Sequence, residues 1–140
     1  MKNKFLVFLL LFVGLIMVGC SGDTRTQLGS SDYSIVIPSG YVLTEDDFDV
    51  YQWEKGSDYT LEEEAKYFAA EYNTTPEKVE INGIKVMKYI SIEVYEEYEY
   101  TVINYMFEDE VSIVEVCFWT VGTDEEYRDV LEIIETLERK

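Results

Sequence analysis

Apolar and polar positions divide the chain into three stretches of different character. The stretch from Phe5 to Val18 carries no charge and reads FLVFLLLFVGLIMV. Residues 21–32 (SGDTRTQLGSSD) are polar with one isolated leucine, whereas 33–140 alternates between strand-like and helix-like periods. Because so polar a stretch cannot bury enough apolar surface to offset its ordering, we expect a flexible tether there. The pattern predicts a leader over 1–19, a tether over 20–32 that begins at Cys20, and a single domain over 33–140.

Period-two alternation predicts that most of the domain is β-strand. The expected strands cover 33–37, 41–43, 48–53, 79–81, 84–94, 98–107 and 111–120. Asn82-Gly83 is the strongest hairpin signal, because both residues accept the left-handed backbone that a tight two-residue turn needs. Short turns join the last three long strands, which favours an antiparallel meander. Their apolar residues occupy both parities, so both faces of the sheet are expected to be covered.

Two segments have the spacing of amphipathic helices, and each begins with a capping box. Thr60 with Glu63 opens the first helix, and Thr123 with Glu126 opens the second. The predicted apolar stripes are Leu61, Ala65, Phe68, Ala69 and Tyr72 in the first helix, and Tyr127, Val130, Leu131, Ile134 and Leu137 in the second. The basic pair 139–140 is expected at the negative end of the second helix. Strands that cluster together predict an α+β fold, with an antiparallel sheet of about five or six strands and helices packed on its faces.

The leader has the parts of a bacterial export signal. Lys2 and Lys4 make a positive start, and the apolar run is shorter than the ~20 residues that a membrane-spanning helix needs. The sequence Met17-Val18-Gly19-Cys20 resembles the lipobox of bacterial lipoproteins, with methionine where that family prefers leucine. The resemblance implies cleavage between Gly19 and Cys20 and fatty acids such as palmitate on Cys20. The alternatives are an ordinary secretory signal and an uncleaved anchor helix.

A chain cut at Cys20 would be strongly acidic. All 29 acidic residues follow Cys20, whereas two of the 11 basic residues lie in the leader, which leaves 9 basic residues and a net charge of −20. Nucleic acid is excluded as a partner, because binding it needs a basic surface. The charge also repels the domain from anionic headgroups. We therefore expect an extracytoplasmic protein that is held at the bacterial cell membrane by the lipid on Cys20.

Catalytic chemistry is restricted because the chain contains no histidine. Ser-His-Asp and Cys-His catalysis are excluded, together with most zinc sites. Cys117 lies in a strand-like run and is expected to be a buried, inert thiol. We predict that the protein is not an enzyme and has no cofactor and no metal centre. The acidic segment 45–49 offers hard oxygen ligands for Ca²⁺, but it lacks the central glycine of an EF-hand and is predicted to be a solvated loop.

Three segments of the domain resemble the PsbP-like superfamily, which includes photosystem II extrinsic proteins and DcrB-type bacterial proteins. They read YSIVIPSGY (33–41), INGIKVMKY (81–89) and YRDVLEIIETLERK (127–140). In that family a short strand with a Ser-Phe-like motif follows the closing helix, whereas this chain has Glu135-Thr136-Leu137 there. The resemblance implies an α/β/α sandwich on an antiparallel sheet. It implies no particular activity, because members of the family do unrelated jobs.

An alternation of tyrosine and glutamate marks residues 93–100 (EVYEEYEY). Tyr95, Tyr98 and Tyr100 are candidates for a partner surface, since tyrosine offers a large rigid contact area with a polar tip. The alternative is that these tyrosines pack under helix edges. Together with the leader, this favours a membrane-anchored binding or accessory domain whose partner is an envelope protein or glycan. A carboxylate-based enzyme acting on envelope glycans and a cation- or small-ligand-binding accessory of a transporter are the alternatives.

Overall fold

The computed structural model describes residues 24–38 and 48–140. Along these ranges the elements are β1 (Thr24–Gln27), β2 (Tyr33–Ile37), β3 (Phe48–Glu54), α1 (Leu61–Ala70), β4 (Glu77–Ile81), β5 (Ile84–Tyr95), β6 (Tyr98–Glu108), β7 (Ser112–Thr120), α2 (Asp124–Ile134) and β8 (Glu138–Arg139). The strands form a three-stranded sheet of order β1-β2-β8 and a five-stranded sheet of order β3-β7-β6-β5-β4. Every pairing is antiparallel, which confirms the α+β class and the predicted meander of β5, β6 and β7.

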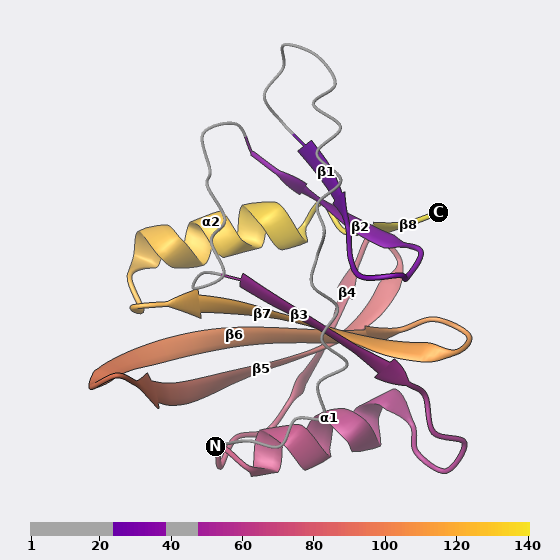
Figure 1. Ribbon diagram of the computed structural model, residues 1–140, viewed down its shortest axis with the longest axis horizontal. Helices are drawn as coiled ribbons and strands as arrows, with labels where there is room; N and C mark the ends of the chain where they lie inside the picture. The colour runs from indigo at the N-terminus through magenta and orange to yellow at the C-terminus, as the bar shows by residue number, and fades with distance from the viewer. Residues whose placement is uncertain (1–23, 39–47) are drawn as a thin grey trace.

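Both faces of the five-stranded sheet are covered, as the two parities of apolar residues predict. Helix α1 covers one face, and α2 with the three-stranded sheet covers the other (Figure 1). The core on the α1 side is built from Leu61, Ala65, Ala69, Met87, Tyr89, Met106 and Ile113. The larger core on the α2 side joins both sheets, and its members include Leu28, Tyr33, Ile35, Tyr105, Phe107, Val116, Phe118, Ile133 and Leu137. The molecule is therefore a helix–sheet–helix sandwich with a second small sheet beside α2.

Local signals in the sequence set the ends of the helices and one tight turn. Thr60 and Thr123 each accept a hydrogen bond from the backbone three residues on, and the glutamates there return one, so both capping boxes are confirmed. Asn82 and Gly83 have φ values of 51° and 80°, which is the two-residue hairpin geometry expected for Asn-Gly. Asn82 also donates two hydrogen bonds of 2.8 Å to the carbonyl oxygens of Glu135 and Leu137, so the turn is bonded to the segment that follows α2.

The predicted flexible tether over 20–32 is wrong for the part that the structure describes. Residues 24–27 form β1 and pair with β2 from Thr24↔Ile37 to Gln27↔Ser34. The isolated Leu28 has 0% exposure and belongs to the large core. The loop that follows is fixed by hydrogen bonds between the Leu28 amide and the Tyr33 carbonyl (2.8 Å) and from the Ser31 hydroxyl to the Leu28 carbonyl. The burial of Leu28 and the pairing of β1 with β2 stabilise this segment although its composition is polar.

The end of the chain also differs from the prediction. Helix α2 ends at Ile134, and Glu138–Arg139 form the short strand β8 on the edge of β2, so the basic pair does not lie at the helix terminus. A strand therefore follows the closing helix as in the PsbP-like family, although the motif is different. Within α2, Val130 and Ile134 of the predicted apolar stripe are buried, whereas Leu131 is 44% exposed. Ile133, which is not part of the predicted stripe, is buried as well.

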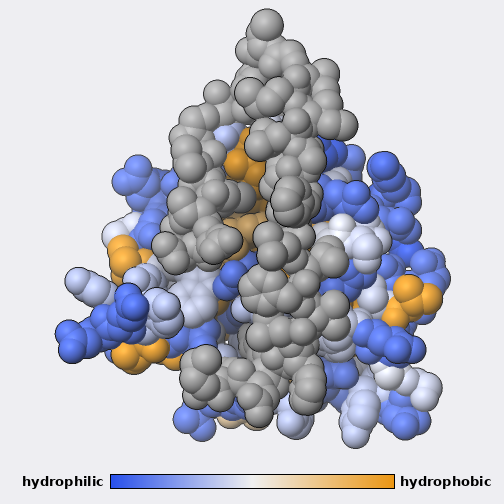
Figure 2. All heavy atoms as spheres, viewed as in Figure 1, coloured by the Kyte–Doolittle hydropathy of each residue, from blue (hydrophilic) through white to orange (hydrophobic). Residues whose placement is uncertain are grey.

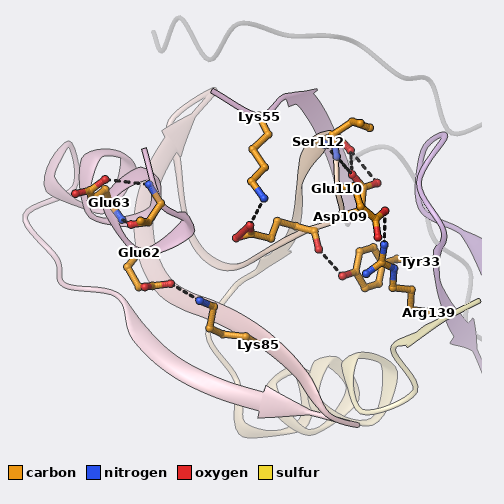
Figure 3. A network of polar contacts seen from close by, with 12 residues as sticks. Tyr33, Lys55, Glu62, Glu63, Lys85, Asp109, Glu110, Ser112 and Arg139 are labelled. Atoms are coloured by element: carbon orange, nitrogen blue, oxygen red, sulfur yellow. Dashed lines mark hydrogen bonds and ion pairs between the residues drawn. The ribbon is translucent and has the colours of Figure 1, made fainter. Parts of the chain in front are cut away.

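A polar network docks the three-stranded sheet against the turn between β6 and β7 (Figure 3). The Tyr33 hydroxyl on β2 donates to the Glu108 carbonyl, and Arg139 on β8 bridges to the Glu110 carboxylate at 2.7 Å. Lys55, just after β3, pairs with the Glu108 carboxylate. The Asp109 carboxylate closes the turn by accepting the amides of the residues two and three positions on. These contacts hold the small sheet beside one end of the large sheet.

Candidate functional site

The three tyrosines predicted as a partner surface lie at the β5–β6 hairpin. Tyr95 and Tyr98 face each other across the hairpin and are 59% and 68% exposed. Tyr100 differs, because it is partly buried and its ring meets Trp119 edge-on with centroids 5.5 Å apart. The structure therefore brings Tyr95 and Tyr98 together at the surface, whereas Tyr100 is part of the packing beneath them.

The tip of this hairpin is acidic and its backbone is unusual. Glu96 and Glu97 form a two-residue turn with φ values of 49° and 71°. Both values lie in the left-handed region that glycine and asparagine occupy readily and glutamate rarely does. Backbone of this kind costs of order 1–3 kcal/mol per residue and is often found at functional positions. The hairpin thus presents two tyrosines and two carboxylates on a turn whose residues are unfavourable for stability alone.

Inward from the hairpin, polar side chains line the face of the sheet that α1 covers. The strand registers place Tyr89, Asn104, Cys117 and Asp49 in one row across β5, β6, β7 and β3. We call these four residues, together with Glu115, the polar strip. Asn104, Glu115 and Cys117 are all buried. A row of polar groups at this depth is unlike the apolar core on the other face of the sheet.

Glu115 is the most deeply placed carboxylate of the polar strip. Its Oε2 accepts a hydrogen bond of 2.6 Å from the Tyr89 hydroxyl, and the Cys117 thiol lies 3.6 Å from its Oε1. Burial raises the pKa of Tyr89, and the neighbouring Glu115 charge raises it further, so the hydroxyl stays protonated and donates. This arrangement stabilises a buried carboxylate and holds its position. Cys117 is the buried thiol that the sequence predicts.

Asn104 orders the neighbouring backbone. Its Nδ2 lies 3.1 to 3.2 Å from three acceptors, which are the Ser91 hydroxyl and the carbonyls of Tyr89 and Val102. Its Oδ1 is buried and has no hydrogen-bond partner among the residues that the structure describes. Such an oxygen is costly unless a donor reaches it, so the polar strip retains an unused acceptor.

Asp49 is the one member of the predicted acidic loop within the described residues; Glu45, Asp46 and Asp47 lie outside them. Its Oδ2 accepts a hydrogen bond of 2.8 Å from the Trp119 indole and lies 3.4 Å from the Tyr51 hydroxyl. The carboxylate is therefore engaged by aromatic donors. Within residues 24–38 and 48–140, no group of histidine, cysteine, aspartate or glutamate side chains is arranged to hold a metal ion.

The sequence alone carried one overlooked signal for the polar strip. Glu115 interrupts an otherwise apolar strand (VSIVEVCFWT), and a charge at that place indicates either a bulge or a built polar site. Asn104 and Tyr89 had no comparable signal, because their meeting depends on strand register. Gly19 and Cys20, the predicted cleavage and lipidation residues, lie outside the described residues. No helix in the described part of the chain is long and apolar enough to cross a membrane.

Comparison with known proteins gives a structural likeness without a sequence match. No protein family matches the chain by sequence, and no curated protein is significantly similar to it. The solution structure of cyanobacterial PsbP (CyanoP) from Synechocystis superposes with a TM-score of 0.61 at 12% identity, covering 88% of this chain and 95% of that one. A crystal structure from Bacteroides thetaiotaomicron gives a TM-score of 0.47 at 16% identity, covering 86% of this chain and 42% of that one, and adds no argument. Taken with the sandwich of helices on an antiparallel sheet, the likeness to CyanoP shows that this domain has the PsbP-like α+β fold.

Proposed function

We propose that the chain is a lipid-anchored, non-catalytic accessory domain of the bacterial cell envelope. One observation carries the proposal: a positive start, an apolar run and Gly19-Cys20 come shortly before a folded domain whose first described strand begins at Thr24. Two acyl chains on Cys20 suffice for stable anchoring, since each buried methylene contributes about 0.8 kcal/mol. The PsbP-like fold is compatible with this role, and a fold by itself implies no particular activity.

The position of β1 makes the proposed anchor a close one. Only residues 21–23 separate Cys20 from the first described strand, and a fully extended chain spans roughly 3.3–3.6 Å per residue. The domain would therefore sit within about 15 Å of the headgroup region, with β1 as its nearest element. With so short a connection, the proposed anchor would keep the domain next to the membrane surface.

The partner side of the proposal rests on the β5–β6 hairpin. Tyr95 and Tyr98 supply exposed aromatic area, and Glu96 with Glu97 supply charge on a turn that is unfavourable for stability alone. We assign this hairpin as the surface that meets an envelope protein or glycan. The polar strip lies further along the same strands, where Tyr89 on β5 pairs with Asn104 on β6.

Replacing Cys20 tests the anchor directly. We expect Cys20→Ser to move the protein from the membrane fraction to the soluble fraction and to abolish incorporation of radiolabelled palmitate. Cys117→Ser is the matched control, since it removes the other cysteine and should leave both properties unchanged. A Cys20→Ser protein that stays in the membrane fraction, or a wild-type product whose intact mass still begins at Met1, would refute the proposal.

A further inference from the structure

One edge of the five-stranded sheet is left open by the residues that the structure describes. Strand β4 pairs with β5 only from Ile84 to Lys88, and the ladder stops where the path of β4 reaches Pro76, which has no N–H to donate. Strand β5 continues to Tyr95. Among residues 24–38 and 48–140, no strand pairs with the outer edge of β5 from 89 to 95. That edge is about 23 Å long at roughly 3.3 Å per residue.

The backbone groups on this edge belong to identifiable residues. In a two-residue hairpin, the residues that flank the turn bond to each other through both backbone groups. Tyr95 and Tyr98 flank the Glu96-Glu97 turn, so odd-numbered residues of β5 bond to β6. The even-numbered residues Ile90, Ile92 and Val94 therefore direct their N–H and C=O groups outward.

The side chains of these same residues are apolar and exposed. Ile90, Ile92 and Val94 are 43%, 52% and 71% exposed, on the face of the sheet opposite α1. Helix α2 packs mainly against β2 and β7. In Figure 2 the left end of the molecule, where this hairpin lies, is hydrophilic at its tip with hydrophobic surface beside it.

Folded proteins normally protect such an edge. Lysine, proline, a bulge or a short strand keeps an edge from pairing with another chain. The open stretch YISIEVY contains neither lysine nor proline, and its only charge is Glu93, whose carboxylate accepts a hydrogen bond from the Tyr72 hydroxyl on the α1 side. An unprotected edge of this length in a stable fold indicates a pairing site.

We propose that the open edge of β5 is a docking site for an extended segment of a partner protein, which adds a strand to the sheet. Charge selects the occupant. Glu93 lies on the α1 side of the edge and Glu96 with Glu97 form the turn beside it, whereas Glu99, opposite Val94, lies on the other face. The added strand therefore carries lysine or arginine on the side of Glu93 and next to the turn, and aliphatic residues on the side of Ile90, Ile92 and Val94. A second copy of this chain is disfavoured, because each copy has a net charge of −18 or beyond.

This inference deepens the proposed function, because it states how the accessory domain holds its partner. Its test uses the full-length product extracted from membranes in mild detergent. The probe is a blocked peptide of alternating lysine and valine, about as long as the edge. Three control peptides are compared with this probe. The first alternates glutamate and valine, the second has the composition of the probe arranged in blocks, and the third is the probe N-methylated on alternate residues. We expect only the unmodified alternating lysine–valine peptide to bind.

Two variants locate the binding on the protein. Ile92→Lys places a repelling charge on the edge without disturbing the core and should weaken the peptide affinity at least about tenfold. Val111→Lys makes the same change of charge at another exposed apolar residue, 70% exposed, in the turn at the opposite end of β6, and should leave the affinity within about twofold. The melting temperature of each variant confirms that it is folded.

Amide hydrogen exchange provides a readout that tests the backbone geometry itself. On binding of the peptide, the amides of Ile90, Ile92 and Val94 should slow at least about tenfold, whereas those of Ser91 and Glu93, already bonded to β6, should not. Equal binding of the N-methylated or block peptide, no loss in Ile92→Lys, or protection of the odd-numbered amides instead would overturn the proposal. A dimer of the wild-type chain that Ile92→Lys dissociates would overturn the choice of occupant. The Cys20→Ser protein should bind the peptide normally, so failure of the anchor and failure of the docking site are distinguishable.

Discussion

Leu28 is the residue that decides whether 24–32 belongs to the folded domain. The side chain has 0% exposure and lies in the larger core, in a segment whose composition is that of a tether. Leu28→Ala removes three buried carbons, which cost about 2.4 kcal/mol at about 0.8 kcal/mol each. The cavity left behind raises the loss to about 3 kcal/mol, within the range of about 2–5 kcal/mol for such changes.

The assay is urea and thermal denaturation of a soluble chain beginning at Ser21. A loss of about 3 kcal/mol should lower the urea midpoint by about 2 M at an m-value of about 1.5 kcal/mol/M. It should also lower the melting temperature by roughly 12–18 °C for a domain of this size. Leu131→Ala is the matched control, because that leucine is 44% exposed on α2 and alanine favours helix, so we expect a loss below about 1 kcal/mol. A Leu28→Ala protein within about 0.5 kcal/mol of wild type would refute the placement of this segment in the core.

Three other predictions concern polar groups. Tyr105→Phe should raise the free energy of unfolding by up to about 1 kcal/mol, because the buried Tyr105 hydroxyl has no partner among the described residues. Tyr89→Phe should lower it by about 1–3 kcal/mol, because it removes the hydrogen bond to Glu115; equal effects of the two changes in urea titration would contradict both predictions. Asn82→Ala removes two side-chain hydrogen bonds and should lower the free energy of unfolding by about 1–3 kcal/mol. Gly83→Ala should cost only the backbone strain of about 1 kcal/mol, because its new Cβ meets no atom within 4 Å; the melting temperatures of the two variants test this order. Burial raises the pKa of Asp109, but the hydrogen bonds of its turn outweigh burial and hold the pKa below its ordinary 3.8. The ionised carboxylate therefore stabilises the fold fully at neutral pH, and this stabilisation is lost as the pH falls below about 4. Asp109→Asn should destabilise the protein at pH 7 and much less near pH 2.5, and an equal loss of stability at both pH values would contradict the prediction.

Features that depend on neighbouring residues could be predicted from the sequence. The capping boxes at Thr60 and Thr123 and the Asn82-Gly83 turn rest on contacts within four residues, so their chemistry is legible in the order of the residues. The long strands β5 to β7 follow from runs of nine or more residues that are rich in β-branched and aromatic side chains and are bounded by turns. The α+β class follows from the grouping of these elements along the chain.

Features set by distant partners could not be predicted in this way. Strands β1 (TRTQ) and β8 (ER) have no apolar pattern, and both exist because β2 offers an edge on each side. The exposure of Leu131 depends on which way α2 turns on the sheet, and the packing of Tyr100 depends on Trp119 in another strand. The polar strip needs the registers of four strands at once, so the sequence could mark single members such as Cys117 and Glu115 but not their meeting.

The three-stranded sheet also determines how the domain responds to mechanical load. One outer strand begins at Thr24, Lys140 directly follows the other, and the central strand β2 lies between the two strands. Thr24 pairs beside Ile37, whereas Lys140 follows the residue that pairs with Tyr33, so a pull between the two points would stretch the sheet along β2. The β1–β2 and β2–β8 hydrogen bonds would both carry that force in shear, and the five-stranded sheet with its open edge would be bypassed. A domain pulled between residues 24 and 140 would thus keep its β5 edge intact until the strand pairs of the small sheet separate.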